Sequence, residues 1–184
     1  MKKIILLVLF FYFSFSNAQK SQISDDEIYT VINYVIQNGN AFQYKKDFKI
    51  ITEDPNVKTD RYFDEKLLSN YFKDKDIIYI MEQFSNSKEF LLNPKYILNL
   101  RIVHIEKLLS YKSEGKSFWT EFNNRYDDKG FMFVGKPLFS LDKKRVVINY
   151  GYYCGGLCGK GSRIILKKIN DTWVFEKEIS GFIS

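Results

Sequence analysis

The sequence predicts an α+β fold, in which N-terminal helices pack on a mainly antiparallel C-terminal β-meander. Two observations carry this prediction. Near its start the chain has apolar residues at helical spacing over residues 25–38, and its last third alternates short strand patterns with turn residues. Helices that come first and an antiparallel meander that follows are typical of the α+β class.

Residues 1–18 have the pattern of a cleavable signal peptide. Two lysines precede an unbroken apolar run, and Ser16-Asn17-Ala18 supplies the small residues that signal peptidase reads, with cleavage before Gln19. The run is shorter than the roughly 20 residues that span a bilayer, and no later segment is apolar enough to be transmembrane. No cysteine follows the cleavage site, so no lipid anchor is expected. We expect a periplasmic or secreted protein, with a single domain over residues 19–184.

The positive charge of the chain, +6 in total, is scattered along the sequence. A nucleic-acid surface needs a concentrated basic stripe, so we expect no nucleic-acid partner and only a generic attraction to anionic envelope polymers. The short basic clusters each flank or interrupt a strand pattern; they are Lys45-Lys46, Lys143-Lys144-Arg145 and Lys167-Lys168.

The helix predicted over residues 25–38 begins at a capping box. The Ser24 hydroxyl can accept a hydrogen bond from the Glu27 amide, and the Glu27 carboxylate can accept one from the Ser24 amide. Gly39 is a suitable C-terminal cap. The single apolar stripe of this helix predicts that it packs on a sheet.

Shorter elements fill the middle of the chain. Asp74 is a candidate cap for the second of two short helices, and a helix over residues 101–112 is an open alternative to the strand expected near His104. The predicted elements are a strand over 47–53, helices over 64–72 and 76–84, a strand over 98–104 that extends to about 108, and a helix over 117–126.

The C-terminal third is predicted to be all strand. Asn170-Asp171 is a two-residue hairpin turn, and a turn is also expected at residues 141–143. The predicted strands cover residues 131–134, 137–140, 145–153, 162–169 and 172–179.

The two cysteines of the chain predict a register for the central hairpin. If Cys154 lies opposite Cys158 across the three-residue loop 155–157, the apolar residues of the two strands meet each other. In the same register Asn149 meets Arg163, and Gly151 meets Gly161. A slip of one residue would destroy this match. Opposed strand residues have Cα atoms roughly 4.5–5.5 Å apart, within the range of a disulfide, and export favours oxidation. We therefore predict a structural disulfide.

Other chemistry at the cysteines fits less well. A redox pair normally has two intervening residues at a helix N-terminus, whereas this pair has three in a hairpin. A zinc site needs about four ligands, and the two cysteines with His104, the single histidine, leave the set short. A cysteine nucleophile would need His104 as its base. The segment Gly159-Lys160-Gly161-Ser162 lacks the spacing and the following helix of a phosphate loop. We expect no metal and no cofactor.

Two interpretations of the residues around the cysteine loop stay open. Alternate tyrosines can simply pack on the two faces of the sheet. Alternatively, Tyr152, Tyr153, Leu157 and Lys160 form a contact surface for an envelope protein or a glycan.

Several motifs of the C-terminal part resemble those of a group of uncharacterised exported bacterial proteins. That group has a Pro-x-Phe-Ser strand entry, a Cys-Gly-x-Leu-Cys-Gly-x-Gly hairpin near the C-terminus and a final Trp strand. The resemblance covers about residues 117–184 and implies no activity. The motifs are Trp119-x-x-Phe122, Gly130-Phe131, the segment 136–142, the hairpin 153–161 and Trp173.

These observations lead us to expect a non-catalytic binding or interaction protein of the cell envelope. No pair of carboxylates is forced onto one concave face, and any histidine-dependent mechanism rests on His104 alone. The alternative is an envelope hydrolase with a pocket between the helices and the sheet.

The disulfide can be tested by mass. Intact exported protein, alkylated under denaturing but non-reducing conditions, should gain no alkyl group, and after reduction it should gain two. The measurement is intact-mass spectrometry of freshly purified material. Two free thiols before reduction would contradict the prediction.

Overall fold

The computed structural model describes residues 22–43, 47–55, 65–111 and 117–184. The predicted signal peptide, residues 1–18, lies outside these ranges, as do Lys45-Lys46 and the first residue of the predicted helix over 64–72.

The described strands form one seven-stranded mixed sheet with the order β2-β1-β3-β5-β6-β7, in which β4 also pairs with β5. β1 runs parallel to both β2 and β3, and the remaining pairs are antiparallel. The α+β class is thus confirmed, but the two parallel pairs make the sheet mixed. The strands are β1 (Ile50–Glu53), β2 (Arg101–Ile102), β3 (Phe131–Val134), β4 (Leu138–Phe139), β5 (Arg145–Gly155), β6 (Cys158–Ile169) and β7 (Thr172–Ile183).

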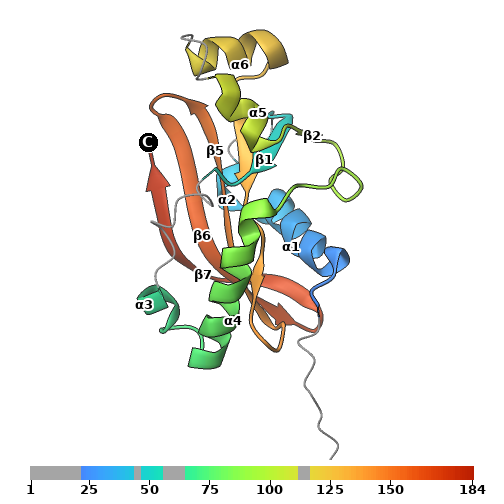
Figure 1. The fold of residues 1–184 in the computed structure, drawn as a ribbon, viewed down its shortest axis with the longest axis vertical. Helices are drawn as coiled ribbons and strands as arrows, with labels where there is room; N and C mark the ends of the chain where they lie inside the picture. The colour runs from blue at the N-terminus through green and yellow to red at the C-terminus, as the bar shows by residue number, and fades with distance from the viewer. Residues whose placement is uncertain (1–21, 44–46, 56–64, 112–116) are drawn as a thin grey trace, which may run out of the picture.

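Helices cover both faces of the sheet. The first two pack on one face, α3 and α4 pack on the other, and α5 and α6 extend from one end (Figure 1). Within the described ranges, no helix combines the length and the apolar character that crossing a bilayer requires. The helices are α1 (Asp25–Asn38), α2 (Asn40–Gln43), α3 (Glu65–Leu68), α4 (Asp74–Ser85), the 3-10 helix η2 (Asn86–Glu89), α5 (Ile105–Ser110) and α6 (Phe118–Tyr126).

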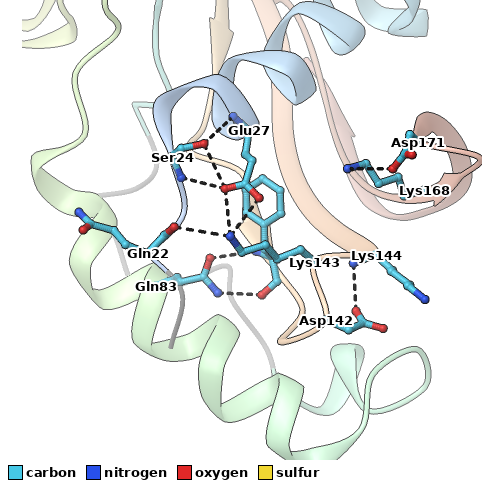
Figure 2. Close-up of polar contacts among 10 residues, drawn as sticks. Gln22, Ser24, Glu27, Gln83, Asp142, Lys143, Lys144, Lys168 and Asp171 are labelled. Atoms are coloured by element: carbon cyan, nitrogen blue, oxygen red, sulfur yellow. Dashed lines mark hydrogen bonds and ion pairs between the residues drawn. The ribbon is translucent and has the colours of Figure 1, made fainter. Parts of the chain in front are cut away.

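The predicted first helix and its capping box are confirmed. The Ser24 amide donates to Glu27 Oε2 at 2.9 Å, and the Glu27 amide donates to Ser24 Oγ at 3.3 Å. Gly39 ends the helix in an extended conformation. Figure 2 shows that Lys143, in the turn before β5, reaches the Glu27 carboxylate at 3.0 Å. The start of α1 is therefore tied to the C-terminal sheet.

Helix α4 is held to the sheet by a buried side chain that pairs with the backbone of β4. Gln83 accepts a hydrogen bond from the Phe139 amide at 2.9 Å and donates to the Phe139 carbonyl at 2.8 Å (Figure 2). The prediction that Asp74 caps this helix is wrong. Lys73 is the N-cap residue, no side chain caps the helix, and Asp74 is its first residue.

The strand predicted over residues 98–104 is mostly replaced by other structure. β2 has two residues, and helix α5 begins at Ile105, so the helical alternative is correct for part of its range. The alternation of apolar residues before His104 reflects an extended segment that pairs only briefly with β1. A buried carboxylate of β1 fixes where this segment ends and α5 begins, as described below.

The predicted register of the central hairpin is confirmed from Val146 to Tyr152. Tyr152 pairs with Lys160, and Gly151 pairs with Gly161. The loop differs, because the pairing shifts after Tyr153 so that Gly155 pairs with Cys158, which leaves a turn of two residues instead of three. The turn at Asn170-Asp171 is also confirmed, with both residues at positive φ.

One row across the sheet contains two glycines between two phenylalanines. Phe133 pairs with Gly151, Gly151 with Gly161, and Gly161 with Phe182. The outer residues are separated by three strand spacings, roughly 14 Å, yet their rings lean over the glycines and lie parallel with centroids 6.4 Å apart. The glycines are therefore required to leave room for these rings.

We expect Gly151→Ala to lower the free energy of unfolding by about 1–3 kcal/mol, because overpacking forces strain on a close-packed site. The added Cβ would contact the Lys160 carbonyl oxygen and lie 2.6 Å from the Phe133 ring. The measurement is denaturant unfolding. The matched control is Gly156→Ala, whose Cβ would meet nothing within 4 Å and which should change stability by less than about 0.5 kcal/mol. Equal stability of the two variants would contradict this account.

Candidate functional site

Three consecutive polar residues are buried at the C-terminal end of β1. Thr52 is fully buried, and Glu53 and Asp54 are only 5% and 3% exposed. Because side chains alternate along a strand, the two adjacent carboxylates point to opposite sides and serve two different clusters. Buried carboxylates are costly unless they are hydrogen-bonded, so the partners of each define its role.

The Glu53 carboxylate joins β1 to two later segments of the chain. It accepts hydrogen bonds from the Leu92 amide at 2.9 Å and the Ile105 amide at 2.9 Å, and it contacts His104 Nδ1 at 2.7 Å. Burial alone would raise the pKa of Glu53, but the Leu92 amide, His104 and the Ile105 amide together lower that pKa below its usual value. The charged carboxylate is therefore the form that this cluster stabilises.

His104 is the residue that precedes α5, and its side chain is 48% exposed. Among the described residues, Glu53 is its one side-chain partner. The prediction that His104 belongs to a strand is wrong. Within the described part of the chain, no group of three or more His, Cys, Asp or Glu residues could hold a metal ion.

The second buried carboxylate lies at a concave surface on the face of the sheet opposite α1. This cavity has a volume of about 540 Å³, and we call it the aromatic groove. Its lining residues are Asp54, Phe133, Asn149, Tyr150, Tyr153, Gly156, Gly161, Ser162, Arg163 and residues 180–184.

A chain of three polar side chains forms the floor of the aromatic groove. Arg163 Nε donates to Asn149 Oδ1 at 2.7 Å, and Asn149 Nδ2 donates to Asp54 Oδ2 at 2.9 Å. The predicted pairing of Asn149 with Arg163 is thus confirmed, and it brings their side chains within hydrogen-bond distance. Burial lowers the pKa of Arg163, while the Asp54 carboxylate opposes that change. The floor presents a buried guanidinium and carboxylate linked by one amide.

The wall of the groove is a stack of three aromatic rings. Tyr153 lies 5.3 Å from Phe133 and 5.6 Å from Phe182 between ring centroids, with interplanar angles of 27° and 25°. Phe182 is 36% exposed at the end of β7. Flat apolar rings beside a small number of polar groups are the composition of ligand-binding sites.

The four residues of the predicted contact surface do not share one face. Tyr152 and Lys160 pair with each other on the α1 side, where Tyr152 packs edge-on to Phe48 at 6.2 Å. Tyr153 faces the opposite side and lines the aromatic groove, and Leu157 is 91% exposed at the turn. The contact surface therefore stays a prediction, with Tyr153 as its one member in the groove.

The cysteines lie at disulfide distance, with Cα atoms 5.0 Å apart, and the structure joins them. The hairpin end that they close contributes Gly156 to the rim of the aromatic groove.

Sequence reasoning assigned no role in a site to Asp54, Phe133 or Phe182. Asp54 looked like the end of a strand before Pro55, Phe133 belonged to the strand predicted over residues 131–134, and Phe182 lay beyond the strand predicted over residues 172–179. The coincidence of Gly151 with Gly161 was the available signal, because two paired glycines leave a sheet surface on which neighbouring rings can lie.

We expect Glu53→Gln to lower the free energy of unfolding at neutral pH by about 3 kcal/mol, because a buried charged acceptor would be replaced by a group with one acceptor oxygen. Since the folded-state pKa of Glu53 is lowered, its contribution is present above the usual glutamate pKa and is lost as pH falls through the folded value. The difference between wild type and variant should therefore shrink below about pH 4.

Thermal and denaturant unfolding at pH 7 and pH 3 measure this effect. Glu89→Gln is the matched control, because Glu89 is exposed in η2 and should change stability by less than about 0.5 kcal/mol. A stability difference for Glu53→Gln that does not depend on pH would contradict the assignment.

The motifs that resemble uncharacterised exported proteins lie in α6, around β4, in the cysteine hairpin and at the start of β7. That resemblance remains a prediction. No family model, curated protein or solved structure matches this chain.

Proposed function

We propose that the protein is a non-catalytic binding protein whose ligand occupies the aromatic groove. The observation that carries the proposal is the stack of Tyr153, Phe133 and Phe182 beside the buried chain of Arg163, Asn149 and Asp54. A cavity of about 540 Å³ lies within the usual size range of ligand sites.

The chemistry of the groove fits a ligand that is rich in hydroxyl groups. Aromatic rings offer flat apolar faces to the C–H face of a sugar ring, while hydroxyl groups can both donate to and accept from polar groups. A carboxylate, an amide and a guanidinium along one edge provide acceptors and donors together. A glycan of the cell envelope is therefore the class of ligand that we propose, and a protein partner is the competing class.

The polar groups of the groove floor, Arg163, Asn149 and Asp54, are poorly suited to proton transfer. The arginine stays protonated at all relevant pH values, and the Asp54 carboxylate is held by Asn149 at 2.9 Å. These groups can orient a ligand, and the lining of the groove does not include His104.

The hydrolase alternative is favoured by one observation, the contact of His104 with the buried Glu53 carboxylate. A carboxylate that orients a histidine is part of many hydrolytic sites. Among the described residues, however, no serine, threonine or cysteine side chain hydrogen-bonds to His104, and Glu53 also binds two backbone amides. The pair is accounted for by its structural role, so the binding function ranks first.

Export to the periplasm or beyond is part of the proposal. The predicted signal peptide and the joined cysteines support it, because disulfides persist in oxidising compartments.

We expect Phe182→Ala to weaken glycan binding at least tenfold, because it removes an exposed ring from the wall of the groove. The probe is the tetramer of N-acetylglucosamine, and the measurement is saturation-transfer NMR with the exported protein. Phe175→Ala is the matched control, since Phe175 is 53% exposed on the same strand but lies outside the groove.

Retained binding by Phe182→Ala, or equal loss in both variants, would contradict the proposed site. The same samples distinguish the alternative function. Cleavage of the tetramer over time, abolished by His104→Asn, would establish a hydrolase instead.

A further inference from the structure

A second cavity lies at the other end of the same sheet face. It has a volume of about 740 Å³ and opens between the start of α4, the turn before β5 and the end of β6. We call it the basic groove, because five cationic side chains line it: Lys73, Lys144, Arg145, Lys167 and Lys168.

The fold brings these cations together from three parts of the sequence. Arg145 and Lys167 are paired residues on neighbouring strands, and the Lys168 amide donates to the Lys144 carbonyl at 2.8 Å. Lys73 arrives from α4 as its N-cap residue. Charges that are scattered along the chain are thus concentrated at one surface.

The acidic groups around the basic groove are already engaged. Asp142 accepts from the Lys144 amide at 2.9 Å and from the Ser140 hydroxyl at 2.7 Å, and Asp76 accepts from the Leu141 amide at 2.9 Å. These bonds shape the turn before β5.

Two of the five cations also have acidic partners. Arg145 pairs with Glu176 at 2.9 Å, and Lys168 lies 3.8 Å from Asp171, as Figure 2 shows for the second pair. Among the described residues, the other three have no side-chain hydrogen bond or ion pair; Lys144 interacts electrostatically with Asp142, and Lys167 with Glu176. They are Lys73, Lys144 and Lys167.

We propose that the basic groove binds a phosphate-bearing polyanion. Lysine ammonium groups are phosphate ligands that act as point charges, and a phosphate group carries more charge and more acceptor oxygens than a carboxylate. The volume suits a ligand with several phosphate groups.

The double variant Lys144→Gln/Lys167→Gln tests the proposal. Tripolyphosphate, titrated into the exported protein by isothermal calorimetry, should bind the wild type, and the double variant should bind at least tenfold more weakly. The affinity should also fall with added salt. Because neither side chain has a hydrogen bond or ion pair within the described residues, the thermal midpoint should not change by more than a few degrees.

The matched control is Lys107→Gln/Lys129→Gln, which removes the same charge from exposed positions outside the groove. An equal loss of affinity in this control would overturn the proposal, since binding would then follow overall charge. The proposal would also be overturned by absence of tripolyphosphate binding, by citrate binding of equal affinity, or by binding confined to phosphatidylglycerol vesicles.

Discussion

The middle of the chain depends on the buried carboxylate of Glu53. Its three partners belong to segments that follow it by about forty to fifty residues, and β2 pairs with β1 over only two residues. A ladder that short cannot position a segment by itself. The amides of Leu92 and Ile105 offset the cost of burying the charge, and in return the charge fixes where the extended segment ends and α5 begins. Neighbouring Asp54, the residue after β1, points to the opposite side and enters the aromatic groove, because side chains alternate along an extended chain.

Local signals in the sequence were sufficient for the elements that are stabilised by near neighbours. The capping box at Ser24 and the register of β5 with β6 involve residues that are close in sequence. The spacing of Ser24 and Glu27 predicts the first, and the alternation of side chains predicts the second. The parallel pairing of β1 with β3 joins residues about eighty positions apart, and no local pattern encodes it. The role of Glu53 could not be predicted either, because nothing near a glutamate at the end of a strand indicates which distant backbone amides it will bind.

Strand pairing brings together basic residues that are far apart in the sequence. Clusters at residues 143–145 and 167–168 each look like an exposed strand end. Antiparallel pairing of β5 with β6 sets Arg145 opposite Lys167, so the two ends become one surface. Only Lys143 leaves it, to pair with Glu27 at 3.0 Å. Scattered charge in a sequence is therefore weak evidence against a basic site when the clusters flank a hairpin.

Strand β6 shows why two different cavities can form on one sheet face. Its alternate residues on that face are Gly161, Arg163, Ile165 and Lys167. Gly161 leaves room for an aromatic ring, and Arg163 belongs to the polar floor of the aromatic groove. Ile165 packs in the core, and Lys167 lines the basic groove. Arg163 and Lys167 are roughly 13 Å apart along the strand. The apolar contact of Ile165 with α3 and α4 occupies the space between them. That contact separates the two cavities, so neither can be enlarged toward the other without removing the packing that holds both helices on the sheet.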